Sequence, residues 1–183
     1  MSTPWTPDEI QTERLLLRRW RAADRAPFAH LNADPAVTEF LAGALTREQS
    51  DAMIDRIEAG FAEHGFGLWA VERRSDGLLL GFTGLSVPAF DAHFTPAVEV
   101  GWRLARAAWG HGYATEAARA ALGFGFTKVG LEEVVSFTVP QNVRSRAVME
   151  RLGMTHDPAD DFDHPRLEAA SPLRRHVLYR LQV

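Results

Sequence analysis

Two glycines lie two positions apart at the point where a strand-like segment gives way to a helix-like one. Gly110 and Gly112 follow the segment AVEVGWRLA and precede an alanine-rich helical pattern that begins at residue 113. The first turn of a helix presents unpaired backbone N–H groups and the positive end of the helix dipole, and glycines let the backbone bend without a Cβ in the way. The N–H groups of residues 109–114 are therefore predicted to converge on a phosphate, with the Thr115 hydroxyl beside them.

A plainer interpretation of the same segment is that the glycines make a tight turn and that the alanines let the helix pack closely on a sheet. Two nucleotide motifs are excluded at once. A dinucleotide-binding fingerprint needs a third glycine at position 115, where the chain has threonine, and a Walker loop needs a Gly-Lys-Ser/Thr ending, which the chain lacks.

Three further polar residues are candidates for chemistry. Glu99 lies on the strand before the glycines, and strand alternation places its side chain on the face opposite Val98 and Val100, either as a base or as a solvent-facing residue. Asn142 is predicted to cap the helix that contains Ser145 in its first turn. The acidic segment 156–165 has no standard metal-ligand spacing, so no metal is predicted.

The elements that position these residues alternate between helix and strand patterns. A capping box from Thr46 to Gln49 starts one helix, and Pro35 is expected to close the helix before it. The turn SDG predicts a hairpin, and the second half of the chain contains a strand–helix–strand unit. Strands are predicted at 13–20, 67–74, 78–87, 97–105, 131–140 and 175–183, and helices at 23–35, 46–64, 113–128 and 142–152.

Composition limits the class of protein. The 183 residues, 46% of them hydrophobic, predict one domain spanning 1–183. A net charge of -4 argues against direct binding to nucleic acid or to a membrane surface. The chain has no cysteine, no long apolar run and no leader-like start, so we predict a cytoplasmic protein.

Three separated stretches together resemble the GNAT acetyltransferases, in particular the branch of the bacterial ribosomal-protein N-terminal (RimJ/RimL-like) acetyltransferases. They are QTERLLLRRW, VEVGWRLARAAWGHGYATEAARAALGFGF and PQNVRSRAVMERLGM, and the closing FDHPRLEAASPLRRHVLYRL is similar too. The resemblance implies an α/β (α+β) GNAT fold: a mixed, mainly antiparallel seven-strand sheet flanked by helices, with splayed central strands. One departure is Ala107, where the superfamily pattern has Gln or Arg.

The resemblance implies acetyl-CoA as the co-substrate. Its pyrophosphate would lie on the N–H groups of residues 109–114, and its pantetheine between the strands 97–104 and 133–139. The backbone of residues 102–104 would supply the oxyanion donor. The implied cofactor-binding residues are Trp102, Arg103, Leu104, Trp109, Gly110, His111, Gly112, Tyr113, Ala114, Thr115, Asn142 and Ser145.

The resemblance also implies the catalytic residues. Glu99 would be the base, directly or through water, and Ser145 or a water would protonate the thiolate, because Met149 stands where many members have tyrosine. The expected acceptor is the N-terminal α-amine of a ribosomal or other protein, whose pKa near 8 requires little help. Small-molecule or aminoglycoside amines and a non-catalytic acyl-CoA sensor are the alternatives. A homodimer is left open.

Overall fold

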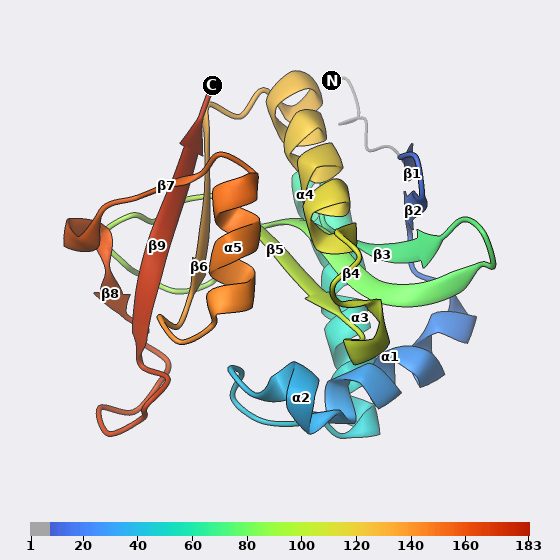
Figure 1. Ribbon diagram of the computed structural model, residues 1–183, viewed down its shortest axis with the longest axis horizontal. Coiled ribbons are helices and arrows are strands. Elements are labelled where there is room, and N and C mark those ends of the chain that lie inside the picture. The colour runs from blue at the N-terminus through green and yellow to red at the C-terminus, as the bar shows by residue number, and fades with distance from the viewer. Residues whose placement is uncertain (1–7) are drawn as a thin grey trace.

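A single sheet of nine strands runs through residues 8–183, the part of the chain that this computed structural model describes, and helices cover both faces (Figure 1). The prediction that the chain has no leader-like start concerns in part residues 1–7, which lie outside the described residues. The strands are β1 Glu9–Gln11, β2 Leu15–Arg18, β3 Leu68–Arg73, β4 Leu78–Ser86, β5 Glu99–Leu104, β6 Glu133–Thr138, β7 Thr155–His156, β8 Phe162–Asp163 and β9 Arg175–Gln182. The helices are α1 Arg25–Ala33, α2 Pro35–Thr38, α3 Arg47–His64, α4 Tyr113–Phe124 and α5 Val143–Arg151, with short turns η1 Ala22–Asp24, η2 Arg106–Ala108, η3 Gly125–Val129 and η4 Pro158–Asp160.

The prediction of seven strands is wrong, because the sheet includes three pairings of only two or three residues. β1, β7 and β8 are too short to show an alternation of apolar and polar residues. They form on the edges that β2 and β9 offer. The predicted mixed, mainly antiparallel sheet is confirmed: the order is β1-β2-β3-β4-β5-β6-β9-β7, β8 pairs with β9, and only β5 and β6 are parallel.

The two central strands separate almost as soon as they meet, as the resemblance implied. β5 and β6 share one register position, Glu99 opposite Val135. The Val135 N–H donates to the carbonyl of Val98 at 2.9 Å, and Ser136 Oγ donates to the carbonyl of Val100 at 2.9 Å. Beyond this point the strands diverge (Figure 1), so residues 101–104 have no strand partner on that side within the described chain.

Local signals set the helix ends. α3 begins with the predicted capping box, in which Thr46 Oγ1 and Gln49 Oε1 each accept from the other residue's N–H, and it ends at Gly65 with φ 75°. The predicted helix 23–35 is two helices. Asp34 caps α2, which begins at Pro35, because a proline fits the first helical position.

α4 lies on one face of the sheet and α3 on the other (Figure 1). Ala117, Ala118 and Ala121 are fully buried, which lets α4 approach the sheet closely, as the plainer interpretation of this segment predicts. The helix continues into the π-turn η3, where Gly125 leaves room for Leu85. Phe28, Ile54 and Phe82 form a separate cluster under α1 and α3.

Candidate active site

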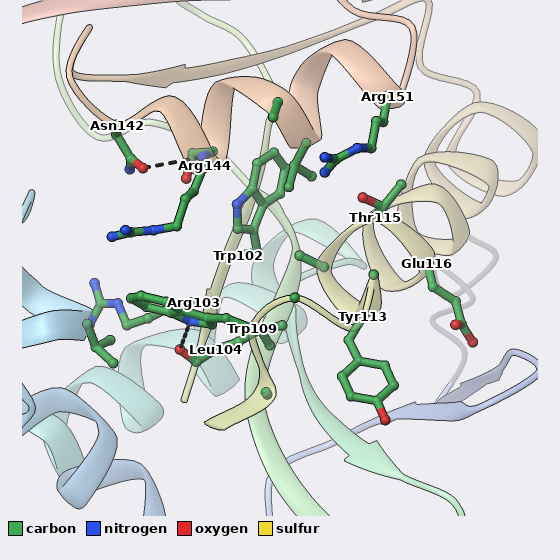
Figure 2. A pocket seen from close by; sticks show the side chains of 18 of the residues that line it. Trp102, Arg103, Leu104, Trp109, Tyr113, Thr115, Glu116, Asn142, Arg144 and Arg151 are labelled. Atoms are coloured by element: carbon green, nitrogen blue, oxygen red, sulfur yellow. Dashed lines mark hydrogen bonds between the residues drawn. The ribbon is translucent and has the colours of Figure 1, made fainter. Parts of the chain in front are cut away.

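One cavity of about 910 Å³ lies between α4, α5, the diverging end of β5 and the segment around α2. Trp102 stands within it, with Asn142 and Arg144 on one side and Tyr113, Thr115 and Glu116 of α4 on the other (Figure 2). Of the predicted cofactor-binding residues, all except His111 line this cavity. The other lining residues are Glu13, Arg14, Ala36, Val37, Phe40, Leu41, Ala108, Glu116, Arg119, Val143, Arg144, Ala147, Val148 and Arg151.

The glycine turn beside this cavity contains a row of backbone N–H groups that have no acceptor in the described chain. Gly110 and Gly112 both have φ 79°, a conformation that side chains with a Cβ rarely adopt. Within the described chain, the N–H groups of residues 110–115 have no hydrogen-bond acceptor, whereas that of Trp109 donates to the carbonyl of Arg106 at 3.2 Å. The row of available donors is therefore shifted by one residue from the predicted 109–114.

An ion pair between Arg14 and Glu116 holds the glycine turn in place. Arg14 donates to the Glu116 carboxylate from its backbone N–H at 2.9 Å and from Nε at 2.7 Å, and its Nη1 donates to the carbonyl of His111 at 2.8 Å. Thr12 Oγ1 also donates to Glu116, at 2.6 Å. Burial raises the pKa of Glu116, but the hydrogen bonds from Thr12 and Arg14 outweigh this effect and lower the pKa below its usual value. No local pattern predicts this contact, because it joins residues 102 apart in sequence.

His111 takes no part in the cavity wall. Its side chain is exposed and stacks beside Tyr113, with ring centroids 5.4 Å apart. Trp109 does line the cavity, and the guanidinium carbons of Arg106 and Arg144 lie 4.8 and 4.4 Å from its ring centroid. Its Nε1 donates to the carbonyl of Leu104 at 2.9 Å, which fixes the ring against the end of β5.

Asn142 and Ser145 meet as the capping pattern predicts. Asn142 Oδ1 accepts from the Ser145 N–H at 3.2 Å, and Asn142 Nδ2 donates to Thr138 Oγ1 at 3.0 Å. The Ser145 hydroxyl lines the cavity and has no hydrogen-bond partner among residues 8–183. Met149 is buried in the core and does not line the cavity.

Glu99 lies outside the cavity wall, on the opposite face of β5. Burial raises the pKa of its carboxyl to about 8, against a hydrogen bond from Ser86 that lowers it. Glu99 is partly exposed, and its carboxyl lies in a desolvated position that the alternation of β5 alone did not indicate. Its Oε1 lies 3.7 Å from the position that a Cβ on Gly101 would take, so the carboxyl leans along its own face of β5 toward Gly101.

Two basic residues that sequence reasoning missed complete the cavity. Arg119 of α4 and Arg151 of α5 line it, and the Arg119 Nη2 donates to the carbonyl of Arg151 at 3.2 Å. Thr115 and Arg151 face each other between the two helices (Figure 2). Free N–H groups, a helix N-terminus and arginines are the donor set that a polyphosphate requires, so the residues present fit the diphosphate of CoA.

The acidic segment forms ion pairs. His156 Nε2 lies 2.7 Å from Asp161 Oδ1, and Asp160 accepts from Arg180 Nε at 2.7 Å. Among the described residues, no group of three or more histidine or acidic side chains is arranged to hold a metal ion. No helix in residues 8–183 is both long and apolar enough to cross a bilayer.

Comparison with known proteins agrees with this geometry. Residues 14–155 match the family described as "Acetyltransferase (GNAT) domain". The protein YkkB of Bacillus subtilis is 33% identical over 147 residues, which are 80% of this chain and 84% of YkkB. The acetyltransferase structure from Agrobacterium tumefaciens is 28% identical, with a TM-score of 0.79 over 98% of this chain and 96% of that one. The ribosomal-protein-S5-alanine acetyltransferase of Vibrio fischeri shares the fold at 15% identity, with a TM-score of 0.74 over 95% and 96%.

The chain therefore belongs to the GNAT acetyltransferase family, as the resemblance implied. Its fold and family make it an acetyl-CoA-dependent N-acetyltransferase. This assignment favours an enzyme over the alternative of a non-catalytic sensor.

Proposed function

We propose that this enzyme acetylates the N-terminal α-amine of a protein, with Glu99 as the base and Ser145 as the donor to the departing thiolate. One observation carries the proposal: burial raises the pKa of Glu99 to about 8, close to the pKa of an α-amino group. Two groups of similar pKa exchange a proton with little cost. A lysine amine, with a pKa near 10.4, would hold its proton against such a base.

The cavity supports the same assignment for the cofactor. We assign the diphosphate of acetyl-CoA to the free N–H groups of residues 110–115, with Arg119 and Arg151 nearby. We assign the pantetheine to the unpaired edge of residues 101–104, where β6 has turned away. The thioester carbonyl then lies against backbone N–H groups of β5, which stabilise the oxyanion of the addition step.

The chemistry needs three proton movements. The acceptor ammonium first gives one proton to Glu99, directly or through water, and the neutral amine attacks the thioester carbon. As the new N–C bond replaces the C–S bond, the nitrogen loses its second proton to solvent water and becomes an amide N–H. The free Ser145 hydroxyl donates a hydrogen bond to the sulfur as the thiolate leaves, and the proton that CoA gains comes through this hydroxyl from solvent. Buried Met149 has no proton to give.

Two observations favour a protein N-terminus over other amines. The Vibrio fischeri enzyme with the same fold is described as acting on alanine of a ribosomal protein, and the sequence resembles the same branch. The match between the pKa of Glu99 and that of an α-amine is the second observation. Polyamines and aminoglycosides are the competing acceptors in the test below.

Release of free CoA thiol, read with a colorimetric thiol reagent, tests the proposal directly. The protein has no cysteine and contributes no background. The acceptors are ribosomal-protein N-terminal peptides, the same peptides with a blocked α-amine, free lysine, polyamines and aminoglycosides. We expect turnover with the free N-terminal peptides and none with the blocked peptides, polyamines or aminoglycosides, and turnover confined to polyamines or aminoglycosides would overturn the proposed acceptor.

Two variants test the proposed catalytic residues in the same assay. General acid–base groups contribute roughly 100-fold to 10,000-fold in rate, so Glu99→Gln should lower kcat by about 100-fold, and Ser145→Ala by about tenfold because a thiolate leaves readily. Both variants should bind acetyl-CoA as the wild type does. Glu63→Gln, a change at an exposed position on α3, is the matched control. Full activity of Glu99→Gln would remove Glu99 from the mechanism.

A further inference from the structure

The side chain of Arg103 lies on the face of the sheet opposite the side chains of its two neighbours. Its neighbours Trp102 and Leu104 pack against the main core beside α4, whereas the Arg103 side chain turns to the opposite face of the sheet. There its Nη1 donates to Asn32 Oδ1 at 2.7 Å, and its guanidinium lies 5.4 Å from the ring centroid of Phe82. The backbone of Arg103 therefore remains on the side proposed for pantetheine, and the residue is part of the cavity lining (Figure 2).

The guanidinium is desolvated and has no acidic partner. Burial lowers the pKa of Arg103 to about 10, and no carboxylate among residues 8–183 forms an ion pair with it. Its Nη1 contacts only the Asn32 amide oxygen and the sulfur of Met53, and its Nε and Nη2 have no acceptor in the described chain. Arg18 shows the usual arrangement for a buried arginine in this protein, with Asp24 at 2.8 Å and Glu72 at 2.7 Å.

A buried polar residue fixes Arg103 in this position. Asn32 is fully buried, and its Nδ2 donates to Ser50 Oγ, also fully buried, at 2.9 Å. Its amide oxygen is thereby held toward the arginine. The free Nε–Nη2 edge is the one that binds a carboxylate with two parallel hydrogen bonds. Arg103 is partly exposed, and its unpaired Nε and Nη2 are not sealed from solvent, so an anion that arrives from outside the chain can reach this edge.

The same face of β5 carries the proposed base. Glu99 and Arg103 lie four residues apart, and Gly101 between them has no side chain. A Cβ at Gly101 would meet only Glu99 Oε1 within 4 Å, at 3.7 Å, so the strand is otherwise open there. At about 3.3 Å per residue, the backbones of Glu99 and Arg103 are roughly 13 Å apart, and the Glu99 carboxyl leans along this face toward Gly101.

We propose that Arg103 binds a carboxylate of the acceptor, so that the substrate is an amine that carries a carboxylate within reach of the amine bound at Glu99. This inference rests on the proposed function, because it takes Glu99 as the place where the amine loses its proton. The carboxylate has two possible sources: the α-carboxylate of a free amino acid, or an acidic side chain beside the N-terminus of a peptide. The shared chemistry is a carboxylate on the Nε–Nη2 edge of Arg103.

Matched acceptor pairs test the proposal by kcat/KM. One arm compares free amino acids with their α-carboxamides, and the other compares N-terminal peptides that have Asp or Glu at the second position with the Asn or Gln peptides. A charge-assisted bidentate contact predicts a preference for the carboxylate of about tenfold to hundredfold in one arm, mainly through KM. This preference should disappear in Arg103→Gln, be reduced in Arg103→Lys, and persist in Arg56→Gln, a control at an exposed position of α3.

The wild-type preference alone decides the outcome if Arg103→Gln fails to fold. Equal kcat/KM for carboxylate and carboxamide in both arms, or a preference that survives Arg103→Gln, overturns the proposal.

A binding arm separates this inference from the proposed function. The affinity of the CoA-bound protein for N-acetylglycine and N-acetylglycinamide, and for the acetylated acidic and amide peptides, is measured by calorimetry and needs no turnover. Selective carboxylate binding that Arg103→Gln abolishes supports the inference even where turnover fails. Turnover on N-terminal peptides without carboxylate selectivity leaves the proposed function intact and overturns the role of Arg103.

Discussion

Arg14 Nε lies 2.7 Å from Glu116 Oε2, so the start of β2 is fastened to the first turn of α4, 102 residues away in sequence. The same arginine donates to the carbonyl of His111 inside the glycine turn. This contact orients the free N–H groups of residues 110–115 without itself being needed for the fold, because the Arg14 side chain is 43% exposed and such pairs contribute little stability.

Glu116→Gln should therefore weaken acetyl-CoA binding more than it weakens the fold. We expect the Kd for acetyl-CoA to rise by about tenfold, equivalent to about 1.4 kcal/mol, while the melting temperature changes by only a few degrees. Glu133→Gln is the matched control, since Glu133 forms a 2.7 Å ion pair with Arg180 far from the cavity. An unchanged Kd for Glu116→Gln, measured by calorimetry, would refute the positioning role.

Gly112→Ala tests the backbone conformation of the turn. Its φ of 79° costs an alanine roughly 1 to 2 kcal/mol, and relief of that strain would reorient the N–H groups that follow. We expect a loss of about 1 kcal/mol in the free energy of unfolding and about tenfold weaker acetyl-CoA binding.

Gly123→Ala is the control for that change. Gly123 lies inside α4, and a Cβ there meets nothing within 4 Å. The substitution should stabilise the helix by about 0.5 to 1 kcal/mol and leave acetyl-CoA affinity unchanged. Urea unfolding measures the stability and calorimetry measures the affinity. The same stability and the same acetyl-CoA affinity in both alanine variants would contradict the role proposed for the backbone conformation at Gly112.

The pH dependence of activity should report Glu99. Its carboxyl, with a pKa near 8, is protonated and unable to accept a proton at lower pH. We expect kcat/KM to rise through about pH 8 in the wild type. Both Glu99 and the acceptor amine titrate in this range, and only the contribution of Glu99 should be absent in Glu99→Gln. Acceptors with different amine pKa values separate the two titrations, and carbon-13 NMR of the carboxyl gives the pKa directly. A rise of kcat/KM that follows only the pKa of the acceptor amine would contradict the assignment of Glu99 as the base.

The free energy of unfolding should also depend on pH through Glu99, and it should fall as the pH rises. The folded-state pKa of Glu99 is raised from 4.5 to about 8, so the folded protein binds more protons than the unfolded chain between these values. The stabilisation is complete below about pH 4.5 and is lost as the pH rises through 8. Relative to Glu99→Gln, the wild type should lose on the order of a few kcal/mol between pH 5 and 8. Parallel stability curves for the two proteins would show that the carboxyl is not desolvated.

Features encoded by neighbouring residues were predictable from the sequence. The capping box at Thr46, the end of α3 at His64 and the asparagine cap at 142 all lie where the pattern places them. α2 was missed because a proline that ends one helix also fits the first position of another.

Features that depend on distant partners were not predictable. The Arg14–Glu116 contact and the fixing of Arg103 by Asn32 join segments that no local period relates. Alternation gave the face of β5 on which Glu99 lies, but its desolvation depends on how β4 and β6 surround it. The number of strands was wrong for the same reason, because the shortest pairings form only on an edge that tertiary structure supplies.

The single register position between β5 and β6 divides the sheet into two parts. Strands β1 to β5 lie on one side of it, and β6, β9 and their short partners lie on the other (Figure 1). An elongated ligand with amide groups along the free edge of residues 101–104 would act as an additional strand and lengthen this narrow connection. In that arrangement the co-substrate would connect the two parts of the sheet, and each release of product would leave them joined only at the Glu99–Val135 position.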